Sequence, residues 1–341
     1  MIPVRPGLPF DPMRTTVYSA EELLSGYSAA IPESYRATVD WKCYLEAMDE
    51  KTKRRRADLP ALDAVYFRLH DLAVEAALAK YLQPKPDEVS SSKRVVGIMG
   101  GHDLERREKM EDHSDAAYMK VALLSWQLSK RGFTIATGGG PGAMEAGNLG
   151  AYFCNRPIDD LRSAVRMLEV VPKVKPSTPD SIRWNSGEWL APALGVVSKH
   201  PRDSSLQTQS VSVPTWFYGH EPPNVFATHI AKYFENSLRE EGLLAICSGG
   251  VVYAEGNAGT VQEIFQDACQ NYYSTYRPPA PMVLLGTRYW NRSSFGLVDT
   301  KSKPAWPLLQ QLGSEKAFID QLLLSDDIDQ IIEFLSKNKH N

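Results

Sequence analysis

Two spacings of apolar residues alternate along the middle of this chain. Short apolar runs at 94–99, 133–137, 250–254 and 281–285 are typical of strands buried on both faces of a sheet. Between the first two runs, residues 114–131 carry apolar side chains at helical spacing and stop at Gly132. Because strands alternate with helices, the pattern predicts an α/β fold with a parallel sheet flanked by helices.

The pattern predicts further elements between these runs. We expect a strand at 167–172 and a long insertion at 173–222, with short strands at 194–199 and 209–213. Such an insertion beside a sheet edge commonly serves as a lid or an interface, and we expect its aromatic rings to pack rather than stack on a base. A helix is expected over 222–241, with an apolar face and a polar stripe formed by His229, Lys232, Asn236 and Arg239.

The two ends of the chain are expected to be mostly helical, unlike the middle. Residues 1–90 predict a mostly helical extension, separated by a Pro- and Ser-rich linker at 84–92 from a nucleotide-binding domain at 91–300. Residues 301–341 predict a helical tail packed on that domain. Within the extension, a helix is expected from Leu62, with an apolar stripe formed by Val65, Leu69, Leu72, Ala76 and Ala79.

Composition narrows the class of protein. A net charge of -3 argues against a nucleic-acid partner, and we interpret the basic cluster at 51–56 as a solvated helix face because acidic residues flank it. The four cysteines have neither disulfide nor metal-ligand spacing. No apolar run approaches the ~20 residues that span a bilayer. We therefore expect a cytoplasmic protein that makes no membrane contact.

Residues 250–263 form a strand, a glycine turn and the start of a helix. Such a turn directs backbone N–H groups and the positive end of the helix dipole at one place, which favours an anion. We expect Thr260 to begin the helix, with Glu263 one turn later. Glu263 then either completes a capping box with Thr260 or presents its carboxylate to the ligand.

Two other predicted strands also end in glycines. Gly100 and Gly101 follow the first strand, and the turn at 138–142 follows the second. Ligands of parallel sheets bind beyond the carboxyl ends of the strands, so these turns are expected to meet. Residues 138–143 satisfy the loose dinucleotide pattern Gly-x-Gly-x-x-Ala, but after the second strand rather than the first. We therefore favour a phosphate or ribose site over a nicotinamide or flavin dehydrogenase.

Two motifs, in this order, resemble those of the lonely-guy family. Residues 138–145 read Gly-Gly-Gly-Pro-Gly-Ala-Met-Glu, and residues 255–263 read Glu-Gly-Asn-Ala-Gly-Thr-Val-Gln-Glu. The resemblance covers about 93–290. Proteins of this family, often labelled lysine decarboxylase-like, are Rossmann-like nucleoside 5'-monophosphate phosphoribohydrolases. The long extension and the insertion resemble a bacterial branch of predicted nucleotide-binding proteins.

The resemblance implies hydrolysis of the N-glycosidic bond of a nucleoside 5'-monophosphate to a free base and ribose 5-phosphate. By the same resemblance, Glu263 and Arg239 would be catalytic. It implies no metal and no cofactor, and it implies a homodimer or a larger homo-oligomer. The residues expected to bind the substrate are Gly100, Gly101, Gly138, Gly139, Gly140, Gly142, Met144, Glu145, Gly256, Asn257, Gly259 and Thr260.

A second hypothesis is a nucleotide sensor that has the same fold and no turnover. Its basis is Glu255, which stands where the family has proline, and Asn257, which stands where it has a second glycine. Both changes lie where a phosphate is expected. Decarboxylation of lysine is not expected, because the sequence shows no recognisable lysine site for pyridoxal phosphate.

Overall fold

The fold is described from a computed structural model that covers residues 5–49, 55–83, 94–174, 186–202, 210–217, 221–291 and 302–337. The predicted linker at 84–92 lies outside these residues, as do Lys51 to Arg54 of the basic cluster. Trp184, Tyr218 and His220 of the insertion lie outside them as well.

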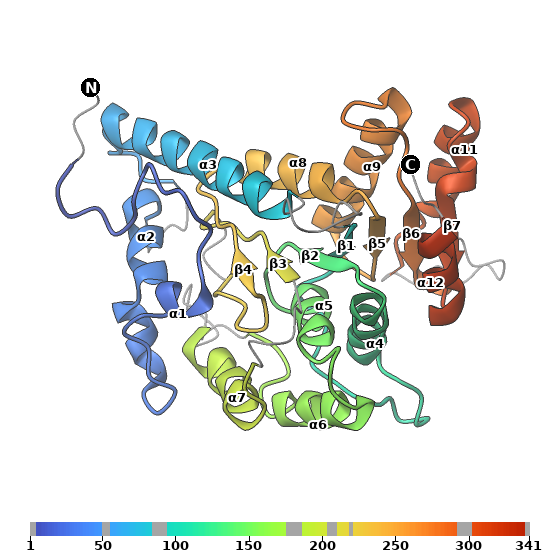
Figure 1. The fold of residues 1–341 in the computed structure, drawn as a ribbon, viewed down its shortest axis with the longest axis horizontal. Coiled ribbons are helices and arrows are strands. Elements are labelled where there is room, and N and C mark those ends of the chain that lie inside the picture. Colours follow the sequence, from blue (N-terminus) through green and yellow to red (C-terminus); the bar gives the residue numbers. More distant parts are fainter. Residues whose placement is uncertain are drawn as a thin grey trace.

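A seven-stranded parallel sheet forms the centre of the molecule (Figure 1). Its order is β4-β3-β2-β1-β5-β6-β7. The predicted α/β fold is thus confirmed, and the carboxyl ends of all strands point to one edge of the sheet. The strands are β1 (Val95–Met99), β2 (Thr134–Thr137), β3 (Ser210–Ser212), β4 (His229–Ile230), β5 (Gly250–Tyr253), β6 (Met282–Leu285) and β7 (Leu322–Ser325).

Helices cover both faces of the sheet. The predicted helix at 114–131 is α4 (Ala117–Lys130), which packs on α5 (Ala143–Tyr152) below the sheet in Figure 1. On the opposite face lie α8 (Asn236–Ile246) and α9 (Ala258–Tyr273). Every residue of β1, β2, β5 and β6 is buried, because both faces are covered.

Three predicted elements of the middle of the chain are wrong. Residues 167–172 form the end of α6 (Ile158–Leu168) and a turn, not a strand. Residues 194–199 belong to α7 (Ser186–Lys199), in which Leu190, Ala193 and Val196 are buried at helical spacing. The predicted short strand at 209–213 is present as β3.

The predicted helix over 222–241 is the third error. Its first half is an extended segment containing β4, which pairs with β3, and a helix starts only at Asn236. Asp71 of the N-terminal extension accepts hydrogen bonds from the backbone N–H groups of Phe234 and Glu235, 2.9 Å and 2.8 Å long. These bonds stabilise an extended backbone just before α8. His229 and Lys232 therefore do not share a helix face with Arg239.

The N-terminal extension packs against the β4 edge of the sheet. It contains α1 (Ala20–Leu23), η1 (Pro32–Ala37), α2 (Val39–Ala47) and α3 (Ala61–Leu82). Tyr18 pairs with Ile230 of β4 through two backbone hydrogen bonds, 2.8 Å and 2.9 Å long. Helix α3 is present as expected, but the expected stripe is on the wrong face, since Val65 and Leu72 are exposed. Phe67 and His70 on the buried face of α3 pack on the aromatic rings of Phe10, Trp216 and Phe234. The same face carries Tyr66, Asp71 and Val74.

The C-terminal segment is only partly helical. It contains α11 (Trp306–Glu315), η2 (Ile319–Gln321) and α12 (Ile328–Lys337), preceded by the short α10 (Thr287–Trp290). Strand β7, which the apolar pattern did not predict, completes the sheet beside β6. Among the described residues, no helix combines the length and the apolar character needed to cross a bilayer.

The close packing of α4 on α5 predicts a contrast between two glycines. A Cβ on Gly150 of α5 would overlap the carbonyl oxygen of Ala122 and lie 2.8 Å from the backbone nitrogen of Trp126. A Cβ on Gly195 of α7 would meet nothing within 4 Å. We expect Gly150→Ala to lower the free energy of unfolding by about 1–3 kcal/mol through overpacking, and Gly195→Ala to raise it by up to ~1 kcal/mol. Urea unfolding of both variants checks this, and equal effects would contradict the packing described.

Candidate functional site

The loops that follow β1, β2, β3 and β5 meet at the carboxyl edge of the sheet. The backbone N–H of Gly101 donates to the carbonyl oxygen of Glu255 over 2.8 Å, and the N–H of Ala143 donates to the carbonyl oxygen of Gly101 over 3.2 Å. Pro214, after β3, lies 2.9 Å from the position of a Cβ on Gly139. The glycine turns at 100–101, 138–142 and 256 therefore lie side by side.

Close packing explains most of the glycines. A Cβ on Gly142 would overlap the carbonyl oxygen of Gly101, and the residue has a φ of +71°. A Cβ on Gly256 would overlap the hydroxyl of Thr260. A Cβ on Gly100 would lie 2.7 Å from that of Ala143. Gly259 differs, because it is exposed and a Cβ there would meet nothing within 4 Å. The described residues therefore impose no steric requirement for glycine at this position.

Arg239 of α8 and Glu263 of α9 lie together beside the Gly138 turn. Nη1 of Arg239 is 3.7 Å from Oε1 of Glu263 and 3.4 Å from the position of a Cβ on Gly138. Asn236 accepts a hydrogen bond from Nη2 of Arg239, 2.8 Å long. The two motifs are therefore brought to one place. Arg239 is 4% exposed, and its Nε has no hydrogen-bond partner among the described residues.

Glu263 does not cap its helix. Asn257 is the N-cap and α9 begins at Ala258, so Glu263 is in the second turn, too far along to bond the first N–H groups. The capping-box interpretation with Thr260 is therefore wrong. The side chain of Glu263 keeps 15% exposure, so its carboxylate is reachable from the loops.

The environment of Glu263 favours its protonated form. The pKa of its carboxyl is raised from 4.5 to about 7. Burial is the largest cause, Arg239 acts in the opposite direction, and the charges of Glu240 and Glu221 contribute to the rise. A carboxyl with a pKa near neutrality can both accept and donate a proton at physiological pH.

This raised pKa predicts a pH dependence of stability. The folded protein binds the Glu263 proton more tightly than the unfolded chain, so the contribution of Glu263 is full below about 4.5 and is lost as the pH rises through about 7. Glu263→Gln stays neutral. We expect the free energy of unfolding of the variant, relative to that of wild type, to rise from about pH 5 to about pH 8 by on the order of 3 kcal/mol. Urea unfolding at both values checks this, and a stability difference that does not change with pH would contradict it.

The structure places the other predicted site residues as follows. Met144 covers the turn, since its sulfur lies 2.8 Å from the position of a Cβ on Gly138. Asn257 donates a hydrogen bond to Asp103 over 3.3 Å. The side chain of Glu255 lies against Gly286, in the loop after β6, so it is directed away from the turn at 138–142.

Glu145 lies beneath the site in a closed network. Its two oxygens accept hydrogen bonds of 2.8 Å and 2.6 Å from the guanidinium of Arg106, and Tyr118 donates a third over 2.9 Å. Arg106 also donates to the carbonyl oxygens of Val171 and Trp189, both over 3.1 Å, and lies over the Trp189 ring. This arrangement favours a structural role for Glu145 over contact with a substrate.

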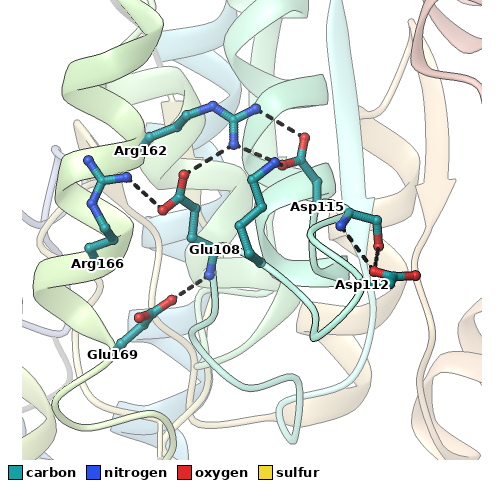
Figure 2. A network of polar contacts seen from close by, with 8 residues as sticks. Glu108, Asp112, Asp115, Arg162, Arg166 and Glu169 are labelled. Carbon is teal, nitrogen blue, oxygen red and sulfur yellow. Dashed lines mark hydrogen bonds and ion pairs between the residues drawn. The ribbon is translucent and has the colours of Figure 1, made fainter.

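A second network fixes the loop after β1 to α6. Figure 2 shows Glu108 between Arg162 and Arg166, with Asp115 on the other side of Arg162. The N–H of Glu108 also donates to Glu169 over 2.6 Å. The loop between β1 and α4 is thus held at two points, by Arg106 and by Glu108.

Glu221 was not among the predicted site residues. Its Cγ lies 3.6 Å from the position of a Cβ on Gly140, and its Oε2 accepts a hydrogen bond from the N–H of Thr215 over 2.9 Å. It belongs to the insertion and to no motif, so no local signal in the sequence marks it.

Comparisons with known proteins identify no family for this chain. No family model and no curated protein matches the sequence. Two solved structures of the molybdenum cofactor carrier protein from Chlamydomonas reinhardtii are similar at 14% identity, with TM-scores of 0.39 and 0.40. Each match covers 72% of this chain, and 99% and 97% of the carrier chains. At this level of overlap the likeness carries no argument about a ligand.

Proposed function

We propose that this protein binds a nucleoside 5'-monophosphate at the joined loops and hydrolyses its N-glycosidic bond. The observation that carries the proposal is the position of Glu263, a carboxyl with a pKa near 7, beside Arg239 and the Gly138 turn. The resemblance to the lonely-guy family points to the same reaction. The sensor hypothesis shares this site and differs only in predicting no turnover.

The phosphate is assigned to the glycine turns. The first turns of α5 and α9 present backbone N–H groups there, and both helices direct the positive end of their dipole to the same edge. Gly259 supports this assignment, because the open space above it admits a ligand close to the backbone. Glu255 is compatible with it, since its side chain lies against Gly286.

The reaction is assigned to the acidic side of the site. Cleavage of the bond between C1' and the base nitrogen leaves positive charge on the sugar, which the carboxylate of Glu263 stabilises. A water adds its oxygen to C1' and gives a proton to Glu263 as the bond from C1' to the base nitrogen breaks. Glu263 then passes this proton to the base nitrogen, so the base leaves as a neutral heterocycle and Glu263 returns to its ionised form. Arg239 holds Glu263 in position, and the products are the base and ribose 5-phosphate.

A panel of nucleoside monophosphates tests the proposal. Each is incubated with the purified protein, and ribose 5-phosphate is assayed alongside the shift in melting temperature. Turnover of at least one nucleotide supports the hydrolase. A raised melting temperature without product supports the sensor, and no response to any nucleotide rejects both.

We also propose a homodimer or a larger homo-oligomer from the family resemblance alone, and a cytoplasmic location from the composition. Sedimentation equilibrium of the purified chain tests the assembly, and a monomer at micromolar concentration would reject it.

A further inference from the structure

We propose that Glu221 is a second carboxylate of the site and that the N-terminal extension positions it, through Asp40 and Lys232. The inference rests on the proposed function for its chemistry, but the placement of Glu221 stands on the contacts alone. These contacts connect α2 to the turn at 138–142 in three steps, each between buried groups.

The first step is the ion pair between the extension and the segment after β4. Asp40 of α2 is 2% exposed, and its Oδ1 lies 2.8 Å from Nζ of Lys232, which is 1% exposed. The same oxygen accepts a hydrogen bond from Nε1 of Trp216 over 2.8 Å, and Oδ2 accepts one from Tyr35 over 2.6 Å. A buried charge needs such partners, so Lys232 depends on Asp40 for its place.

The second step connects Lys232 to the site loop. Its ammonium donates a hydrogen bond to the backbone carbonyl oxygen of Glu221 over 2.6 Å and lies 5.5 Å from the centre of the Trp216 ring. A charged donor makes a stronger hydrogen bond than a neutral one. The main chain at Glu221 is therefore held by Lys232, whose ammonium is paired with Asp40 of the extension.

The third step directs the side chain of Glu221. Its Oε2 accepts from the N–H of Thr215, and Oε1 has no hydrogen bond among the described residues. The chain carbons lie against the Gly140 turn, where a Cβ would sit 3.6 Å from Cγ. The side chain of Glu221 is thus held at the turn at 138–142 by a residue of the insertion.

The charges around Glu263 agree with this placement. Arg239 pairs with it from α8, and Tyr253 of β5 donates to its backbone carbonyl. The charges of Glu240 on α8 and of Glu221 in the loop after β3 raise the pKa of Glu263. When Glu263 is ionised, the carboxylates of Glu221, Glu240 and Glu263 outnumber the one arginine, so the site is negative. Such a surplus suits a reaction that builds positive charge on a sugar, so Glu221 adds to the stabilisation given by Glu263.

Two variants and a direct titration test the inference. We expect Glu221→Gln and Asp40→Asn each to lower kcat for the preferred nucleotide by about 10-fold or more, with KM changed less. Both should lower the pKa of Glu263, measured by carbon NMR on protein labelled at the glutamate carboxyls. Glu46→Gln is the matched control, because Glu46 is also on α2 but pairs with Arg5 instead of Lys232. It should leave both kcat and the titration as in wild type.

The titration separates this inference from the proposed function. If wild type hydrolyses no nucleotide, the hydrolase fails, while a lowered Glu263 pKa in Glu221→Gln still supports the placement of Glu221. An unchanged Glu263 pKa in Glu221→Gln would overturn the inference, whatever the turnover. If a folded Asp40→Asn variant had the wild-type pKa of Glu263 and the wild-type kcat, the proposed role of the extension would be wrong. Should Asp40→Asn not fold, Lys232→Met, which removes the donor to Glu221, replaces it with the same expected results.

Discussion

Replacing Glu263 with glutamine is expected to lower the release of ribose 5-phosphate by at least about 100-fold. Glutamine keeps the shape of the side chain and removes the group that takes the proton from water and faces the charged sugar. The substitution leaves the glycine turns and the helix N-termini assigned to the phosphate unchanged, so the nucleotide should still bind. We therefore expect kcat to fall while the nucleotide still raises the melting temperature. Steady-state kinetics and thermal shift on the same preparation measure both.

A second glutamate provides the control for this experiment. Glu241 is on α8, next to Glu240, but its carboxylate accepts hydrogen bonds from Gln266, Gln270 and Tyr276, away from the glycine turns. Glu241→Gln should hydrolyse nucleotides at close to the wild-type rate. If Glu263→Gln retained wild-type kcat, the assignment of the reaction to Glu263 would be wrong even with the site intact.

The sheet was predictable because its central strands are covered on both faces. The runs that became β1, β2, β5 and β6 are rich in apolar residues and buried throughout, and topology then requires their glycine turns to share an edge. The glycine positions alone therefore predicted that these turns meet at one edge of the sheet. Met144 was also found by its motif, and it covers the turn at Gly138.

What the sequence could not reveal depends on contacts between distant segments. Apolar residues at 225–234 have helical spacing, yet the backbone before α8 is extended because Asp71 bonds to Phe234 and Glu235. Lys232 looks like a surface residue until Asp40, far away in sequence, is found 2.8 Å from it. Glu221 owes its position to that pair. Local periodicity contains no information on such partners. The sequence therefore predicted the glycine turns, Arg239 and Glu263, but not Glu221.

Replacing Arg106 with methionine is expected to lower the free energy of unfolding more than Gly150→Ala does. Methionine fills a similar volume and removes every donor, which leaves the carboxylate of Glu145 buried with Tyr118 as its remaining partner. Breaking a buried pair from one side typically costs about 3–5 kcal/mol. A domain of ordinary stability has only about 5–15 kcal/mol in total, so the variant should unfold at much lower urea concentration than wild type. Urea unfolding followed by circular dichroism measures this.

The network around Arg106 also predicts how the loss can be reversed. In Arg106→Met/Glu145→Met no charge remains buried, so the double variant should be more stable than Arg106→Met alone. Arg56→Met is the surface control, since its partner Asp58 is exposed, and this variant should unfold close to wild type. Equal losses in Arg106→Met and Arg56→Met would show that the buried pair does not hold the loop after β1. Because that loop contributes Gly101 to the site, a true loss at Arg106 should also weaken nucleotide binding in the fraction that remains folded.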